Sequence, residues 1–344
     1  MERRDFIRAS GIIALAGLAA SHFTSPGSVL SRVPPNGRDA SNVYTETRHC
    51  LGTLVDITVS VPESVTLNDV HRLLDKAFAE IDRLSGILSR HAASSHLYEL
   101  NRRGLLEYPP SELSKLTETA LDFARDTNGY FNPSIGPIIN AIAHHDTNYS
   151  DIHSMAVNRT DWRKIQITDS GIQFLAEDMC ITLDGIAKGY IVDRASDLLS
   201  GNGIDNHLIN AGGDLTARGV AGPGKAWRIG IQDPHRQGRV FADFFHGISG
   251  QAIATSGNYV SLADPRRGYP HLIIPGTGKS PESILSMSVS APTAIEADAL
   301  ATALFVMPLE DAVQYVSGNP EIGMLAILSN GTCRECGKWP KKTA

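Results

Sequence analysis

The chain has 344 residues, of which 42% are hydrophobic and 20% charged, enough apolar material for one large core or two smaller ones. Its formal net charge of −6 argues against nucleic acid as the main partner, because binding to phosphates requires a basic surface. The lysines and arginines are scattered along the sequence and form no basic stripe.

The N-terminus predicts an exported protein. The segment Arg3-Arg4-Asp5-Phe6-Ile7-Arg8 has the form of a twin-arginine export motif, and an apolar run over residues 12–20 follows it. This run is shorter than the ~20 residues that a membrane-spanning helix needs, and its small residues suit a signal peptidase. We therefore predict a twin-arginine signal peptide over residues 1–20 and a periplasmic location. An uncleaved membrane anchor is the alternative.

The next segment, residues 21–44, is predicted to be a linker because much of it is rich in proline, glycine, serine and asparagine. From residue 53 onward the hydrophobic pattern changes to that of regular elements. Residues 53–61 alternate as in a strand, and residues 67–88 carry apolar side chains at helical spacing.

Further helices and strands follow in irregular order. Helices are expected at 111–127, from 136, and at 187–199 and 296–307; strands are expected within 163–183 and at 207–210, 227–232, 251–256 and 286–290. Because the two types do not alternate regularly, an α+β architecture is favoured over a doubly wound sheet. We expect a single catalytic unit over residues 45–330, followed by a polar C-terminal tail over residues 331–344.

Cysteine usage gives little evidence of catalysis. Cys333 and Cys336 form a Cys-x-x-Cys pair in the polar tail, which in an oxidising compartment either closes as a local disulfide or remains two thiols. One such pair is weak evidence for zinc. Cys180 lies in an apolar run and is expected to be a small core residue.

Two glycine-containing segments have the character of anion sites. In residues 182–189 a predicted strand leads into a helix N-terminus, with glycines at the junction and Lys188 in the first turn. Free amide groups and the helix dipole favour a phosphate there, although a tight turn that needs small residues explains the pattern equally simply. Residues 210–214 fit either a loop that approaches a ligand or a hairpin turn. Neither segment matches the known Gly-rich nucleotide fingerprints.

A pair of oxygen donors lies on the last predicted helix. Asp298 and Thr302 are four residues apart and therefore share a helix face. A carboxylate and a hydroxyl are hard ligands suited to Mg²⁺. The alternative is an acid favoured by the helix dipole and a threonine that bonds back to the chain.

Taken together, these segments resemble the ApbE family of FAD:protein FMN transferases in type and order. The matching segments are Leu51-Gly52-Thr53, residues 128–137, residues 185–193, residues 210–214, residues 254–259 with His271, and residues 297–303. The resemblance implies a T-fold-like arrangement of mixed sheets with packed helices. It also implies Mg²⁺-dependent transfer of the FMN moiety of FAD to a threonine or serine hydroxyl of an exported or membrane flavoprotein, with release of AMP.

The resemblance further implies roles for individual residues. Mg²⁺ would be bound by Asp298, Thr302 and the backbone carbonyl of Gly185, and His271 would be the general base. FAD contacts are implied at Leu51, Tyr130, Phe131, Asn132, Thr182, Lys188 and Leu272. The membrane would be contacted only through the acceptor protein.

Several positions depart from the family pattern. Thr182 stands where the family has an aspartate that contacts FAD, Asp184 replaces a glycine, His91 replaces a tyrosine, and Ile274 replaces an aspartate. Together with the twin-arginine motif, these departures are similar to the ApbE-like branch that serves nitrous oxide respiration. Two alternative functions remain: an FAD pyrophosphatase that uses water as acceptor, and a non-catalytic periplasmic flavin-binding maturation factor.

Overall fold

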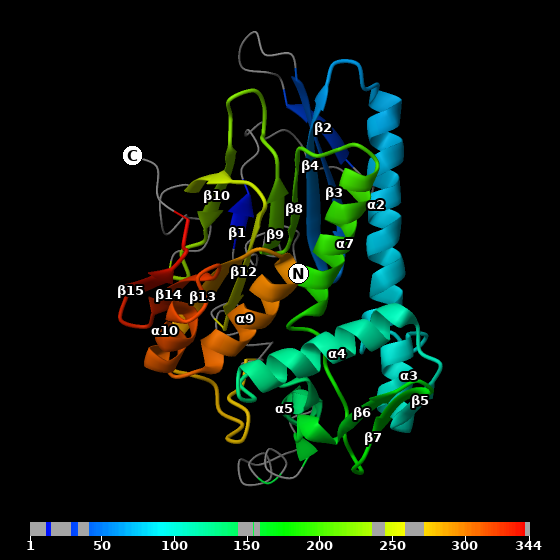
Figure 1. The fold of residues 1–344 in the computed structure, drawn as a ribbon, viewed down its shortest axis with the longest axis vertical. Helices are drawn as coiled ribbons and strands as arrows, with labels where there is room; N and C mark the ends of the chain where they lie inside the picture. Colours follow the sequence, from blue (N-terminus) through cyan, green and yellow to red (C-terminus); the bar gives the residue numbers. More distant parts are fainter. Residues whose placement is uncertain are drawn as a thin grey trace.

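The architecture is built on one large antiparallel sheet. The computed structural model describes residues 12–14, 29–33, 41–143, 154, 159–235, 245–258 and 272–340. A nine-stranded sheet has the order β15-β14-β13-β12-β9-β8-β4-β3-β2 (Figure 1). Its strands are β2 (Val29–Val33), β3 (Ser41–Cys50), β4 (Thr53–Pro62), β8 (His207–Ala211), β9 (Asp214–Arg218), β12 (Gln251–Gly257), β13 (Ile284–Ala291), β14 (Gly323–Leu328) and β15 (Cys333–Gly337).

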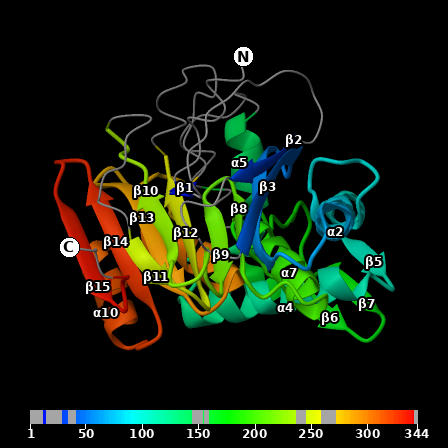
Figure 2. The same cartoon turned by 90° about the horizontal axis from the view of Figure 1, so that it is seen from above.

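Helices cover one face of this sheet, as Figure 2 shows. The three that pack on it and on one another are α2 (Leu67–Leu88), α7 (Ala187–Gly201) and α9 (Ala294–Val306). Around them lie α3 (His96–Arg103), η1 (Pro133–Ile135), α4 (Ser111–Asp126), α5 (Gly136–Ala143), η2 (Trp162–Lys164) and α10 (Leu309–Ser317). The amphipathic pattern of residues 67–88 predicts α2 with its observed bounds, and the Thr66 side chain caps its N-terminus.

The opposite face of the large sheet has its own apolar layer. Successive side chains of β8 point to opposite faces of the sheet. Ile209 therefore packs in the core beneath the helices, and Leu208 packs in a second cluster that contains Trp227. Trp227 belongs to a small sheet of β1 (Ile12–Ala14), β10 (Trp227–Ile231) and β11 (Phe245–Ile248). Another small sheet contains β5 (Leu105–Glu107), β6 (Ile165–Thr168) and β7 (Gly171–Phe174). The predicted α+β class is therefore confirmed.

Three stretches differ from their predicted structure. β2 and the start of β3 lie in the range 21–44 predicted to be a linker, and β15 lies in the predicted polar tail. Edge strands pair through backbone groups, so a weak hydrophobic pattern does not prevent pairing. Residues 179–183, expected to form a strand, have no strand partner. The Asn101 side chain instead bonds both backbone groups of Ile181, at 2.8 Å each.

The four cysteines are free thiols. Cys333 and Cys336 both lie in β15, where residues three apart point to opposite faces, so this geometry disfavours a local disulfide. Cys180 is partly buried and borders a pocket, where burial raises the pKa of its thiol to about 11. Cys180 therefore lies at the wall of this pocket and outside the hydrophobic core clusters, although the sequence predicts a small core residue. In the described part of the chain, no helix is both long and apolar enough to cross a membrane.

Candidate functional site

The site forms where the N-terminus of α7 approaches α9. Gly189 lies so close to α9 that an added Cβ would lie 2.2 Å from the carbonyl oxygen of Ala294. Asp193, one turn further along α7, accepts hydrogen bonds from the N–H groups of Ala294 and Ile295, at 2.9 Å each. The close approach and this cap fix the start of α9 and thereby place Asp298 against α7.

The three predicted metal ligands lie together at this junction. A carboxylate oxygen of Asp298 accepts the N–H of Gly189 at 3.0 Å. A Cβ at Gly185 would lie 2.7 Å from Oγ1 of Thr302, so glycine is needed for this contact. Ser256 at the end of β12 brings a second hydroxyl within 3.4 Å of the same Oγ1. The set contains only hard oxygen donors, which fit Mg²⁺.

Asp298 carries an unusually buried carboxyl group. It is 3% exposed, and burial raises its pKa to about 7; the charge of Asp214 adds to the shift, and Lys188 opposes it. Among the described residues, no three histidine, cysteine, aspartate or glutamate side chains form a metal-binding cluster. The predicted set includes a carbonyl and a hydroxyl, so it is not a cluster of that kind, and Mg²⁺ at this place stays a prediction.

Lys188, a predicted FAD contact, forms an ion pair with Asp214. Burial alone would lower the pKa of Lys188, but the charges of Asp214 and Asp298 outweigh it and raise that pKa. Asp214 begins β9 after the turn that closes the β8–β9 hairpin, in which Gly213 donates to the Asn210 side chain at 3.0 Å. Residues 210–214 are therefore a hairpin turn that also supplies a buried carboxylate to the site.

The remaining predicted FAD contacts lie in tightly held segments. Leu51 occupies the β3–β4 turn with a positive φ of 55°. Phe131 is buried beside Phe123, and Asn132 uses its side chain to cap η1 and to donate to the Thr160 carbonyl at 2.9 Å. Tyr130 precedes them, partly buried against the core.

Thr182 and Leu272 connect further segments to the site. The backbone N–H of Thr182 donates to the Pro133 carbonyl at 2.8 Å, which joins the 130–133 segment to the start of the α7 junction. Leu272 is buried, and its backbone is bonded in both directions to the Asn258 side chain. His271 lies outside the described residues.

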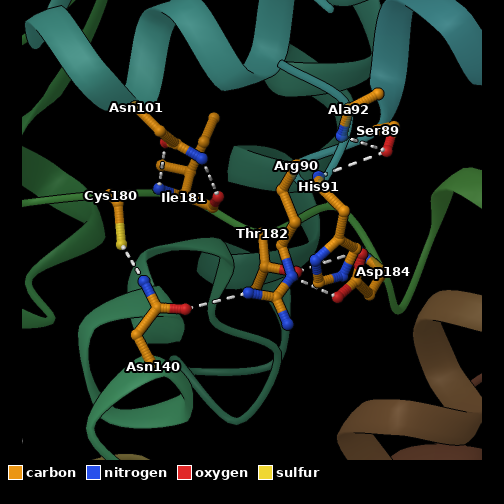
Figure 3. Close-up of polar contacts among 10 residues, drawn as sticks. All are labelled: Ser89, Arg90, His91, Ala92, Asn101, Asn140, Cys180, Ile181, Thr182 and Asp184. Carbon is orange, nitrogen blue, oxygen red and sulfur yellow. Dashed lines mark hydrogen bonds and ion pairs between the residues drawn. The ribbon is translucent and has the colours of Figure 1, made fainter. Parts of the chain in front are cut away.

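A pocket of about 520 Å³ lies next to this junction. Its lining consists of Arg90, His91, Tyr98, Asn101, Arg102, Gly136, Asn140, Cys180 and Ile181. Figure 3 shows the polar contacts of Arg90, Asn101, Asn140 and Cys180 in this lining. Of these residues, the sequence marks His91 as a departure from the family pattern, Cys180 as a core residue and Gly136 as part of the segment 128–137. The lining comes from segments far apart in sequence, and no local pattern reveals their convergence. The pocket has the volume of a small-molecule site.

The structure is an α+β fold in which a set of oxygen donors lies at a helix N-terminus, and the Arg90–Asp184 ion pair joins the turn before that helix to the pocket. The model of the ApbE family matches residues 51–326, and the chain belongs to this family. Among curated relatives, the FAD:protein FMN transferase of Salmonella typhimurium is 30% identical over 283 residues, covering 77% of this chain and 79% of the relative. The FAD:protein FMN transferase of Treponema pallidum is 28% identical and covers 87% of this chain and 88% of the relative.

Solved structures show the same fold. The ApbE protein of Thermotoga maritima has a TM-score of 0.73 at 28% identity, covering 86% of this chain and 97% of that chain. The flavin transferase ApbE of Vibrio cholerae has a TM-score of 0.75 at 23% identity, covering 86% of this chain and 96% of that chain.

Proposed function

We propose that this ApbE-family enzyme transfers the FMN moiety of FAD to a threonine or serine hydroxyl of an exported or membrane flavoprotein and releases AMP. The observation that carries the proposal is the meeting of Gly185, Asp298 and Thr302 beside Lys188 at the N-terminus of α7. The curated relatives named FAD:protein FMN transferase support it.

In the proposed reaction, the acceptor hydroxyl oxygen bonds to the phosphorus on the FMN side of FAD. The bond from that phosphorus to the AMP oxygen breaks, and the hydroxyl proton passes to His271. Asp298, Thr302 and the Gly185 carbonyl would hold Mg²⁺, which when bound supplies positive charge to the pyrophosphate. Amide groups at the start of α7 and the ammonium of Lys188 orient phosphate oxygens.

We expect covalent FMN on the acceptor and one AMP per adduct when protein, FAD, Mg²⁺ and an exported flavoprotein are incubated together. The adduct is measured by mass spectrometry and AMP by chromatography. Equal release of AMP and free FMN without any acceptor would instead identify a pyrophosphatase. Tight binding of FAD without AMP under either condition would identify a non-catalytic flavin-binding protein.

We also propose export to the periplasm by the twin-arginine route, with cleavage near Ala20. Replacing Arg3 and Arg4 together by lysine is expected to leave the uncleaved precursor in the cytoplasm, because the paired arginines are the recognised feature. Cell fractionation and the mass of the N-terminus measure the result. An unchanged periplasmic yield of the double variant would refute this route. Cleavage would also remove β1, which pairs with β10.

A further inference from the structure

Arg90 is held in a fixed orientation at the wall of the pocket. It directly follows Ser89, the C-cap of α2, whose hydroxyl accepts the N–H groups of His91 and Ala92 at 3.2 Å each. Nε of Arg90 donates to Asp184 at 2.6 Å, and Nη1 donates to the Asn140 side chain at 3.0 Å (Figure 3). These bonds join the end of α2 to α5 and to the turn before α7.

The bracing leaves part of the guanidinium available for a ligand. The Arg90 side chain is 16% exposed. Within the part of the chain that the structure describes, its Nη2 makes no hydrogen bond. A guanidinium carries five N–H donors and no acceptor, and two fixed partners reduce the entropy lost when it binds a further group.

We propose that Arg90 is a specificity-determining residue that donates a hydrogen bond to a carbonyl oxygen on the flavin ring of FAD. This inference rests on the proposed function and assigns one part of the substrate to the pocket. Arg90 is a binding residue in it, and Asp184 and Asn140 are positioning residues.

The charge at Arg90 favours a neutral acceptor over a phosphate. The ion pair with Asp184 offsets the charge that Arg90 itself presents to a ligand, and Arg102 is the other arginine in the pocket lining. The flavin ring offers neutral carbonyl oxygens along its pyrimidine edge. Adenine has no carbonyl oxygen: it accepts only through ring nitrogens, and its exocyclic amine is a donor that a guanidinium cannot accept. His91 and Tyr98 supply flat rings to the same pocket, and such rings favour a planar ligand.

The position of the pocket suits the two ends of the substrate. Residues 181–185 run from the pocket wall at Ile181 to Gly185, the predicted carbonyl ligand of the cation. Asp184, the partner of Arg90, directly precedes Gly185. A ring bound beside Arg90 would therefore have its ribityl phosphate directed toward the start of α7, where Lys188 lies.

The test measures equilibrium binding of FAD, FMN, riboflavin and ADP to the full chain without an acceptor protein, so no turnover is required. Arg90→Gln is expected to raise the Kd of FAD, FMN and riboflavin by a similar factor of about 10–100, because a charge-assisted hydrogen bond to their shared ring is lost. The Kd of ADP should not change. Arg83→Gln, which removes an ion-paired arginine on α2 that lies outside the pocket lining, is the matched control and should leave all four values unchanged.

Two results would overturn the inference. Unchanged riboflavin binding in a folded Arg90→Gln protein would leave Arg90 a purely structural role, and a loss confined to FAD and ADP would place it at the adenosine diphosphate half. If Arg90→Gln does not fold, Arg90→Lys retains a cation opposite Asp184 and should still lose part of the riboflavin affinity. Normal FMN transfer with unaltered riboflavin binding in Arg90→Lys would refute this inference and leave the proposed function standing. If the parent protein shows no FMN transfer but the Arg90 variants lose riboflavin affinity, the proposed function is refuted and the inference about Arg90 stands.

Discussion

Replacing Asp298 by asparagine is expected to lower FMN transfer by about 10³-fold or more while the protein stays folded. Asparagine has nearly the same shape and retains an oxygen that can accept the Gly189 N–H, so the contact between α7 and α9 is preserved. The change removes the only carboxylate among the three predicted cation ligands. Charge stabilisation by a bound metal is worth several kcal/mol in the transition state, and each 1.36 kcal/mol corresponds to tenfold in rate.

The measurement combines initial rates over a range of Mg²⁺ concentrations with thermal unfolding. Asp56→Asn is a suitable control, because burial raises the pKa of Asp56 as it does that of Asp298, but Asp56 accepts the Thr47 hydroxyl at 2.6 Å and lies outside the predicted oxygen set. We expect this control to keep the parental rate and Mg²⁺ dependence. A folded Asp298→Asn protein with the parental Mg²⁺ dependence would show that Asp298 is not a ligand.

The sequence predicts the central elements of the fold because their hydrophobic periods are strong and local. The spacing in residues 67–88 fixes α2, and Asp298 and Thr302 fall on one helix as their four-residue separation requires. The order of the glycine segments leads to the ApbE family, which the comparisons confirm. These signals are short-range patterns that can be recognised before any tertiary contact is known.

The features of the fold and the site that the sequence does not predict depend on contacts between residues far apart in the chain. Arg90 meets Asp184 across 94 positions, and no local pattern selects one ion pair among the many that charged side chains permit. Lys188 pairs with Asp214. The sequence around Asp214 fits a simple hairpin turn equally well and so does not predict this pairing. The edge strands β2 and β15 have weak patterns because pairing through backbone groups places little demand on their side chains.

The location of Leu272 supports the proposed role of His271, the preceding residue, as general base. Asn258 directly follows β12, and its side chain binds both backbone groups of Leu272, at 3.3 and 3.4 Å. Two residues earlier, Ser256 contacts Thr302 of the predicted cation set. The residue that follows His271 in sequence is therefore tied to the strand end that borders the candidate site.

His271→Ala is accordingly expected to lower FMN transfer by about 10²–10⁴-fold with little change in the Kd of FAD, the usual contribution of a general base. Transfer is followed as FMN covalently bound to an acceptor peptide, and changing the target threonine of that peptide to valine should eliminate the adduct. His207 is the matched control, because it is a packing histidine: buried, bonded to Ser196 at 2.7 Å, with its pKa lowered to about 4 by burial. His207→Ala should reduce thermal stability and leave the rate of the folded fraction unchanged, since a neutral imidazole that serves the core takes no proton from substrate. If His271→Ala behaves like His207→Ala, losing stability but not rate, the proton acceptor is another group of the site.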